Sequence, residues 1–301
     1  MKNRDIVSIK DLSKEEILAV LDRAEEMKQK SPGPILKGHI LANCFFEPST
    51  RTRLSFESAM KRLGGEVIGF SEPTTTSAQK GETLHDAMKI MGYYSDIMVI
   101  RHPAAGSAQE AAEASDTPVI NGGDGPNEHP TQTLLDLFTI KECQGKLTGL
   151  KIGFVGDLLN GRTVHSLAPT LGMFDNRFYF VSPPALGMPS AICQNLRQTG
   201  VPFSLHPTIE EILGRVDILF MTRVQGERFR SQEEYQKLKD HFILKPHMLQ
   251  GAQKNLKILH PLPRVNEIER GVDQTPYAYY FQQAQNGLWI RQALLAMILG
   301  K

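Results

Sequence analysis

The sequence of 301 residues is poor in cysteine and lacks the signatures of several protein classes. Its three cysteines, Cys44, Cys143 and Cys193, are odd in number, widely spaced and without a C-x-x-C pair. They predict neither a disulfide framework nor a zinc site, and are typical of buried thiols in a reducing compartment. No apolar run approaches the roughly 20 residues of a transmembrane helix, and the N-terminus lacks the apolar core of a signal peptide. We expect a soluble, cytoplasmic protein.

Charge of one sign is not in excess either. The chain has 34 basic and 33 acidic residues, a net charge of +1, which provides no electrostatic footprint for nucleic acid or an anionic membrane. The glycines of "GFVGDLLNG" do not match G-x-G-x-x-G, and neither a Walker pattern nor G-x-S-x-G occurs. No histidine, cysteine and aspartate cluster has metal-ligand spacing. The sequence therefore predicts no nucleotide cofactor, no metal and no serine-hydrolase chemistry.

What the sequence does have is a repeated alternation of short apolar runs with helical patterns. The runs that read as strands buried on both faces are "ILANCFF", "EVIGF", "DIMVIR", "PVIN", "LKIGFVG", "FYFV", "DILFMTR" and "LKILHP". Segments with helical spacing lie between them, many ended by glycine. "TIEEILG" predicts a further helix, opened by a capping box of Thr208 and Glu211. This alternation predicts an α/β fold of two domains, each a mostly parallel sheet flanked by helices.

The stretch "FFEPSTRTRLSFESAMKRLGG" places hydroxyls and guanidiniums at one strand-to-helix corner. Pro48 ends the strand, and Ser49 or Thr50 can cap the helix that follows. A helix N-terminus attracts anions through its unpaired N–H groups and its dipole. Thr52 adds another hydroxyl donor, and the planar guanidinium of Arg51 matches a phosphate group. The corner therefore predicts a phosphate site.

Polar side chains also follow other predicted strands, where ligands gather in open α/β sheets. In the first half, "RHP" carries Arg101 with His102, and "GDGPNEHPTQ" carries His129 with Gln132. The second half has cationic and polar groups at three strand ends; these are Arg162, Arg223, Gln225, His260 and Arg264. Arginines at such positions typically bind carboxylate or phosphate. We interpret the two halves together as a cleft between two domains, in which a phosphorylated molecule is joined to a small acid.

These motifs together resemble the aspartate/ornithine carbamoyltransferase family, and within it the catalytic chains of the aspartate enzymes. The segments that carry the resemblance, in matching order from end to end, are "STRTR", "RHP", "HPTQTLLDLFTI", "GRTVHS", "RVQGER", "HPLPR" and "YFQQAQNGLWIRQALL". The implied reaction transfers the carbamoyl group of carbamoyl phosphate to L-aspartate, an early step of de novo pyrimidine biosynthesis. The final helix could close either half; with the resemblance we expect a carbamoyl-phosphate domain of residues 1–133 plus 285–301 and an aspartate domain of residues 134–284.

The resemblance implies roles for individual residues. The carbamoyl phosphate ligands would be Ser49, Thr50, Arg51, Thr52, Arg101, His129, Gln132, Leu262 and Pro263, the last two through backbone carbonyls. Arg51, Arg101 and His129 would polarise the carbamoyl carbonyl and so belong to catalysis. Arg162, Arg223 and Gln225 would hold the carboxylates of aspartate. The implied chemistry needs cations at the oxyanion and the leaving phosphate rather than a covalent nucleophile or a cofactor.

The resemblance also implies that each active site is shared between chains. The loop "TTTSAQKGET" would reach the neighbouring subunit's site, where Lys80 would act in catalysis and in aspartate binding. Its companion hydroxyl could be either Thr76 or Ser77. A homotrimer is then expected, and separate regulatory chains remain possible.

Two alternatives remain. Ornithine carbamoyltransferases share the phosphate motifs, but they carry "HCLP" and an "SMG" loop where this chain has "HPLP" with Pro261 and "TRVQGER". A site for cationic ornithine would also not favour Arg162 with Arg223. The other alternative is a non-catalytic protein that binds a phosphorylated metabolite; turnover would distinguish it.

Overall fold

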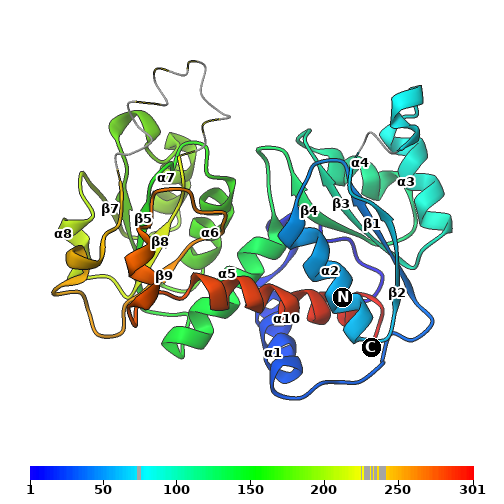
Figure 1. Cartoon of the computed structure of the whole chain (residues 1–301), viewed down its shortest axis with the longest axis horizontal. Helices are drawn as coiled ribbons and strands as arrows, with labels where there is room; N and C mark the ends of the chain where they lie inside the picture. Colours follow the sequence, from blue (N-terminus) through cyan, green and yellow to red (C-terminus); the bar gives the residue numbers. More distant parts are fainter. Residues whose placement is uncertain (73–75, 225, 227–230, 232, 234–235, 237–241) are drawn as a thin grey trace. The chain divides into compact units, whose positions relative to one another are not determined.

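The computed structural model describes residues 1–72, 76–224, 226, 231, 233, 236 and 242–301. The chain forms two compact units, of which the first comprises Met1–Phe138 with Gln285–Lys301 and the second Thr139–Ala284. Each unit contains one parallel sheet, of four strands in the first and five in the second. Figure 1 shows helices around each sheet. The predicted fold class, two α/β domains built on parallel sheets, is confirmed.

The first unit has the sheet order β2-β1-β3-β4. Its strands are β1 (Ile40–Phe45), β2 (Glu66–Phe70), β3 (Ile97–His102) and β4 (Val119–Asp124). Its helical elements are η1 (Ile9–Asp11), α1 (Lys14–Gln29), α2 (Thr50–Arg62), η3 (Ser77–Lys80), α3 (Leu84–Tyr93) and α4 (Ser107–Ala114). Two helices contain the unit boundaries within them, α5 (Pro130–Gln144) and α10 (Tyr280–Ile298).

Both faces of the first sheet are covered. Ala42 and Cys44 of β1 pack with Met88 of α3 and with the alanines of α4 in one apolar cluster. Side chains alternate along a strand, so Asn43 points to the opposite face, where its amide donates to Arg53 O of α2 over 3.2 Å. Phe56 of α2 is fully buried. The sheet is therefore held between two layers of helices, and its carboxyl edge is left for other groups.

The second unit has the sheet order β7-β6-β5-β8-β9. Its strands are β5 (Lys151–Val155), β6 (Arg177–Val181), β7 (Phe203–His206), β8 (Ile218–Met221) and β9 (Lys257–Leu259). Its helical elements are α6 (Arg162–Gly172), η4 (Pro184–Leu186), α7 (Ser190–Gln198), α8 (Glu210–Leu213), η6 (Pro246–Leu249) and η7 (Arg270–Gln274).

Alternate residues of the central strands fill the two sides of the second sheet. Phe154 of β5 contacts Phe178, Phe180 and Phe220 on neighbouring strands, with ring centroids 5.5 to 5.8 Å apart. The next residue, Val155, belongs to a different apolar cluster on the other face. Phenylalanine packing on one face and a mixed aliphatic and aromatic cluster on the other thus bury the middle of the sheet.

Every predicted strand is present, but two details differ from the expectation that all are buried on both faces. β2 is largely exposed, with Ile68 at 37 %. β2 is an edge strand whose outer side has no neighbour, whereas the other edge strand, β4, is buried and pairs with Ile6. β7 was not predicted at all. It too is an edge strand, and Leu205 is 68 % exposed, so its sequence lacks the continuous apolar run of a central strand.

The predicted capping box of Thr208 and Glu211 is wrong. The helix α8 begins at Glu210 with Ile209 at its N-cap, and no side chain caps it. The carboxylate of Glu211 instead lies 2.9 Å from His206 Nδ1 at the end of β7. An available histidine partner from the neighbouring strand therefore replaces the local backbone contact.

Candidate functional site

Three adjacent strands of the first sheet end beside the residues assigned to carbamoyl phosphate. In the order β1-β3-β4, β1 leads into α2 with Arg51, β3 carries Arg101 near its end, and β4 leads to His129 before α5. The carboxyl ends of parallel strands lie at one edge of the sheet, which is where ligands bind in open α/β folds. The fold therefore brings together groups from three separate motifs.

The N-terminus of α2 follows the predicted corner, with one correction. Ser49 occupies the N-cap position with extended backbone angles, φ −157° and ψ 94°, but its side chain makes no capping hydrogen bond. The expectation that Ser49 or Thr50 caps the helix is confirmed for the position, which is Ser49, but not for a capping hydrogen bond from its hydroxyl. The helix starts at Thr50. N–H groups in the first turn of a helix lack intrahelical acceptors, so this corner can donate to an anion.

Thr52 and His129 meet across this edge of the sheet. The Thr52 hydroxyl lies 3.5 Å from His129 Nε2, and Thr131 Oγ1 lies 3.4 Å from His129 Nδ1. Thr52 and His129 are both buried, with 7 % and 6 % of their surfaces exposed. Hydroxyls can donate or accept, so either imidazole tautomer can be accommodated. The histidine is thus enclosed between two hydroxyls from different helices.

The two arginines form the cationic part of the site. Arg101 donates to Gly122 O over 3.1 Å and to Glu47 Oε1 over 3.3 Å. Burial lowers the pKa of Arg101, while the nearby Glu47 carboxylate opposes that shift. Arg51 is exposed over much of its surface, but the partial loss of water around its guanidinium also lowers its pKa, and the charge of Arg101 lowers it further. Each guanidinium therefore feels the other as a like charge, which a bound anion would relieve.

Gln132 lies in the first turn of α5, beside His129. Its amide nitrogen donates to Asp136 Oδ1, one helical turn further on, over 2.8 Å. The N–H of Gln132 also donates to His129 O over 2.9 Å. Gln132 is half-buried, whereas Asp136 is completely buried. The amide is consequently anchored from its buried side.

Lys80 ends the short 3₁₀ helix η3 and is exposed. Thr76 and Ser77, the two candidates for the companion hydroxyl, both line a groove that also includes Phe46, Phe70 and other residues. The structure contains a single chain, so the expected action of Lys80 in a neighbouring site stays a prediction. The choice between Thr76 and Ser77 also stays open.

The second unit places its candidate residues at the ends of three adjacent strands. Arg162 begins α6 after β5, Arg223 follows β8, and Leu262 and Pro263 follow β9. Both arginines are half-buried. Gln225, predicted to bind aspartate with them, lies outside the described residues. The described groups share the carboxyl edge of the second sheet, as the first set shares that of the first sheet.

The turn after β9 is held by a buried histidine in one definite tautomer. The N–H of Leu262 donates to His260 Nδ1 over 2.8 Å, so Nδ1 must be the unprotonated nitrogen. His260 Nε2 then carries the proton and donates to Glu267 Oε1 over 2.6 Å. The peptide bond between Leu262 and Pro263 is cis, and Leu262 has a φ of +53°. His260 therefore sets the backbone whose carbonyls are assigned to the carbamoyl group.

Arg264, in the same motif, is engaged within the second unit. Its guanidinium donates to both carboxylate oxygens of Asp273 and, over 3.0 Å, to the Tyr280 hydroxyl. It also lies over the Tyr280 ring, 5.2 Å from the ring centroid. A bidentate pair of this kind holds a planar side chain firmly. Arg264 therefore anchors the end of the turn.

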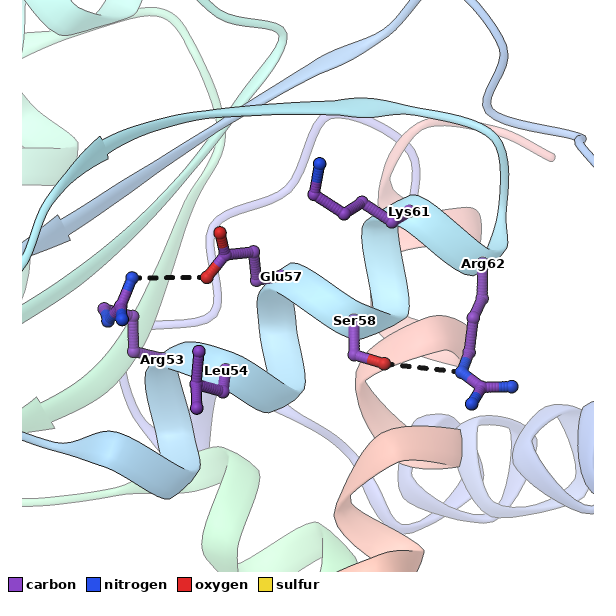
Figure 2. A pocket seen from close by; sticks show the side chains of 6 residues that line it. All are labelled: Arg53, Leu54, Glu57, Ser58, Lys61 and Arg62. Atoms are coloured by element: carbon purple, nitrogen blue, oxygen red, sulfur yellow. Dashed lines mark hydrogen bonds and ion pairs between the residues drawn. The ribbon is translucent and has the colours of Figure 1, made fainter.

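A pocket on α2 does not coincide with the predicted anion site. Figure 2 shows its lining residues, Arg53, Leu54, Glu57, Ser58, Lys61 and Arg62. Arg53 is paired with Glu57 over 3.2 Å, and Arg62 Nε donates to Ser58 over 3.3 Å. The lining starts after the four residues assigned to phosphate. The guanidinium of Arg53 is thus engaged with another side chain of its own helix.

Within the described ranges, no three or more His, Cys, Asp or Glu side chains are grouped to hold a metal ion. Among those residues, no helix is both long and apolar enough to cross a membrane.

Sequence reasoning missed two residues that support the site. Glu47 contacts Arg101, and Asp136 contacts Gln132. Both stand inside the motifs quoted from the sequence, in "FFEPST" and "HPTQTLLDLF". A carboxylate directly beside an expected anion site is the signal that could have identified Glu47, because cations in partly buried sites usually need a counter-charge.

Comparison with known proteins supports the resemblance that the sequence motifs indicate, over nearly the whole chain. Residues 4–142 match the model for the aspartate/ornithine carbamoyltransferase carbamoyl-P binding domain, and residues 148–298 that for the Asp/Orn binding domain. The aspartate carbamoyltransferase catalytic subunit of Chromobacterium violaceum is 53 % identical, over all of this chain and 99 % of its own length.

Solved structures agree. The catalytic subunit of M. jannaschii aspartate transcarbamoylase is 46 % identical, with a TM-score of 0.93 over 99 % of this chain and 98 % of its own. Aspartate transcarbamoylase from Trypanosoma cruzi, in complex with carbamoyl phosphate and aspartate, is 35 % identical. Its TM-score is 0.93, over 99 % of this chain and 97 % of that one.

Proposed function

The chain belongs to the aspartate/ornithine carbamoyltransferase family, and we propose how its residues perform the family's reaction. The chain transfers the carbamoyl group of carbamoyl phosphate to the amino group of L-aspartate, giving N-carbamoyl-L-aspartate and phosphate. The observation that carries the residue assignment is the meeting of Arg51, Arg101, Thr52 and His129 beyond three adjacent strands. That set suits a phosphate bonded to a carbonyl group.

The first step we propose is attack of the aspartate amine on the carbamoyl carbon. The carbonyl oxygen gains negative charge as a tetrahedral intermediate forms, and Arg51, Arg101 and His129 stabilise it. The carbon–oxygen bond to phosphate then breaks, and the leaving phosphate takes up the proton that the amine loses. Arg51 and the donors of Ser49, Thr50 and Thr52 hold this phosphate. Donors positioned where charge develops are usually the largest contribution to such a reaction.

No covalent intermediate on cysteine enters this scheme. Burial raises the pKa of Cys44 and of Cys143 to about 12 each, and it raises the pKa of Cys193 as well. A thiol acts as a nucleophile in its thiolate form. The three thiols therefore suit apolar packing, and direct transfer from phosphate to amine is the route that the site supports.

The second unit provides the aspartate ligands in this proposal. Arg162 and Arg223 stand at the carboxyl edge of the second sheet and would each pair with a carboxylate of aspartate. The backbone carbonyls of Leu262 and Pro263, with Gln132, would accept hydrogen bonds from the carbamoyl amino group. Residues 1–133 with 285–301 are then the carbamoyl-phosphate domain, and residues 134–284 the aspartate domain.

We further propose a homotrimer in which Lys80 of one chain serves the next chain's site, and a cytoplasmic location. The exposed position of Lys80 in η3 supports the first proposal. The three free cysteines support the second, since such thiols persist in reducing compartments. The reaction would serve an early step of de novo pyrimidine biosynthesis. Mass measurement in solution tests the trimer, and also any association with regulatory chains.

The direct test is turnover. Purified protein is incubated with carbamoyl phosphate and L-aspartate, and N-carbamoyl-L-aspartate and phosphate are measured in equal amounts. A parallel incubation replaces aspartate with L-ornithine, and a third omits the protein. Product with aspartate alone supports the proposal. Product with ornithine would favour the other activity of the family, and no product with either would favour a non-catalytic binding protein.

A further inference from the structure

Two buried side chains of opposite charge contact residues of α5 next to His129: Asp136 accepts from Gln132, and Arg291 donates to Thr131. Arg291 in the last helix, α10, is 4 % exposed, and Asp136 in α5 is completely buried. Burial lowers the pKa of Arg291 to about 9, and the charge of Asp136 opposes that shift. At neutral pH Arg291 therefore remains a cation, because its pKa is still above 7. Asp136 lies in "HPTQTLLDLFTI" and Arg291 in "YFQQAQNGLWIRQALL", but the sequence assigned neither of them to a substrate.

The guanidinium of Arg291 is tightly enclosed by three helices of the first unit. It lies over the ring of Phe56 in α2, 5.0 Å from the ring centroid, and donates to Thr131 Oγ1 in α5 over 3.4 Å. Gly287 makes room for it, because a Cβ there would stand 2.3 Å from Arg291 Nη1. Figure 1 shows α2 and α10 in the same region of this unit. The cation is therefore fixed in position.

Asp136 in turn determines which way the Gln132 amide faces. Gln132 Nε2 donates to Asp136 Oδ1 over 2.8 Å. An ionised carboxylate only accepts hydrogen bonds, so it must receive the NH₂ end of the amide. The carbonyl oxygen of Gln132 is then the end left to face a ligand, and it can only accept. The NH₂ of a carbamoyl group can donate a hydrogen bond to this acceptor. A methyl group in the same place cannot, so the acceptor would be left without a partner.

The charge on Arg291 protects this orientation. A carboxylic acid that has taken up a proton can donate, and it could then bond to the carbonyl end of Gln132 and turn the amide over. A neighbouring cation favours the ionised form of a carboxyl group. Arg291 thus acts on Gln132 through the charge of Asp136, which accepts the hydrogen bond from the Gln132 amide.

We infer that Asp136 and Arg291 are positioning residues that make the site selective for a carbamoyl group over an acetyl group. The inference rests on the proposed function, because it assigns the carbamoyl NH₂ to Gln132. The site would distinguish carbamoyl phosphate from acetyl phosphate, which has nearly the same shape and differs in carrying CH₃ in place of NH₂. A polar group left without its hydrogen-bond partner is a strong basis for rejecting such an analogue.

Stability alone does not account for the pair. Replacing a buried ion pair by apolar residues of similar size is often neutral or stabilising, whereas removing one partner is strongly destabilising. The double variant Asp136→Leu/Arg291→Met should therefore fold, because it removes both charges together. It also removes the acceptor that holds the Gln132 amide. This separates the positioning role from the structural one.

The experiment compares kcat/KM for the two phosphates at saturating L-aspartate. With acetyl phosphate the amine attacks the acetyl carbon, the bond to phosphate breaks, and N-acetyl-L-aspartate and phosphate form. Both substrates are measured on the same preparation, so their ratio does not depend on the folded fraction. For the double variant we expect the carbamoyl/acetyl ratio to fall by roughly 10- to 100-fold relative to the unmodified protein, mainly through loss of carbamoyl transfer.

Two variants serve as controls. Leu137→Ala truncates a fully buried neighbour of Asp136 in α5 and should lower the melting temperature while the ratio stays the same. Arg291→Lys keeps a cation and should preserve the ratio, whereas Arg291→Met alone should lower it. If the double variant does not fold, the comparison of Arg291→Lys with Arg291→Met still shows whether the charge at this position affects the carbamoyl/acetyl ratio.

The inference is overturned if the double variant folds and keeps the ratio of the unmodified protein, or if Arg291→Lys and Arg291→Met give equal ratios. Failure of the proposed function would look different. In that case the unmodified protein would form no N-carbamoyl-L-aspartate, and there would be no preference to lose.

Discussion

The guanidinium of Arg101 and the carboxylate of Glu47 are joined by a hydrogen bond of 3.3 Å at the carboxyl edge of the first sheet. The Arg101 side chain is 11 % exposed and that of Glu47 36 %. The carboxylate stands where two arginines would otherwise repel each other, since the charge of Arg101 helps to lower the pKa of Arg51. Glu47 therefore partly neutralises a site built for an anion.

Glu47→Gln should strengthen phosphate binding. The amide oxygen can still accept from Arg101, while the negative charge that competes with the ligand is gone. A unit charge at such a distance in a partly solvated site contributes about 1 kcal/mol, or roughly fivefold in the dissociation constant. Calorimetric titration with inorganic phosphate measures the dissociation constants of the variant and of the unmodified protein. Glu57→Gln, on the pocket-facing side of α2, is the matched control and should change nothing. Weaker phosphate binding by Glu47→Gln would show that its charge is needed to hold Arg101.

Arg51→Ala should reduce turnover far more than stability. Arg51 is exposed and sits in the first turn of α2, so its truncation leaves no cavity. Losing one donor to a developing anion commonly lowers kcat by about 100- to 1000-fold. Arg62→Ala, in the last turn of the same helix, provides a control that also removes one charge. Steady-state kinetics measure the loss of turnover, and thermal melting measures the loss of stability. A near-normal kcat in Arg51→Ala would contradict the phosphate assignment.

Arg223→Ala should raise the KM for L-aspartate strongly and leave the dissociation constant of carbamoyl phosphate nearly unchanged. The reason is that a guanidinium–carboxylate pair is lost in the second unit while the first keeps its own ligands. Arg215→Ala, an exposed arginine shortly before β8, controls for the change in charge. An equal loss of carbamoyl phosphate binding would mean that the two units do not divide the substrates in this way.

Stability should fall as the pH drops below about 6.5, and His260 should contribute to that fall. Burial lowers the pKa of His260, so below about 6.5 the unfolded chain takes up a proton that the folded protein does not. The pKa of Glu267 is lowered too; burial alone would raise it, but the hydrogen bond from His260 and other contacts outweigh that effect. Its contribution is lost only below about 4.3, as the pH falls through its folded pKa.

Between about pH 4.5 and 6.5, the change in stability with pH therefore comes mainly from the histidines. Chemical unfolding across this range should show a shallower pH dependence for His260→Asn, whose side-chain oxygen can still accept from the Leu262 N–H. The slope should not vanish, because burial also lowers the pKa of His165. An unchanged slope in His260→Asn would mean that His260 is protonated in the folded state.

Lys80 should act in the neighbouring chain's site. Lys80→Ala and Arg51→Ala should each be nearly inactive alone, and mixing after dissociation and reassembly should restore activity. In a random cyclic trimer with heterologous contacts, roughly a quarter of the interfaces combine an intact Arg51 with an intact Lys80. Activity near that fraction supports a shared site. No recovery from trimers that mass measurement shows to be mixed would assign Lys80 to its own chain.

The sequence predicted the central elements of both sheets well, because a strand buried on both faces must be apolar along its whole length. "LKIGFVG" and "DILFMTR" became β5 and β8 for this reason. The same rule failed at one edge strand of each sheet, because β2 is exposed and β7 has no such run, although it held for the edge strands β4 and β9. The capping box at Thr208 failed because a contact with His206 on another element competed for Glu211. Local patterns do not contain such partners.

The sequence by itself indicated the family and which residues to propose for the site, since motifs such as "STRTR" and "HPTQ" are local and complete. Only the tertiary structure decided which motifs meet. The strand order β1-β3-β4 places Arg51, Arg101 and His129 at one edge, and strand order depends on how whole helices pack against a sheet. The orientation of Gln132 likewise depends on a buried Asp136 and on a cation from the last helix. Such contacts between distant parts of the chain arise from packing, so no local pattern encodes them.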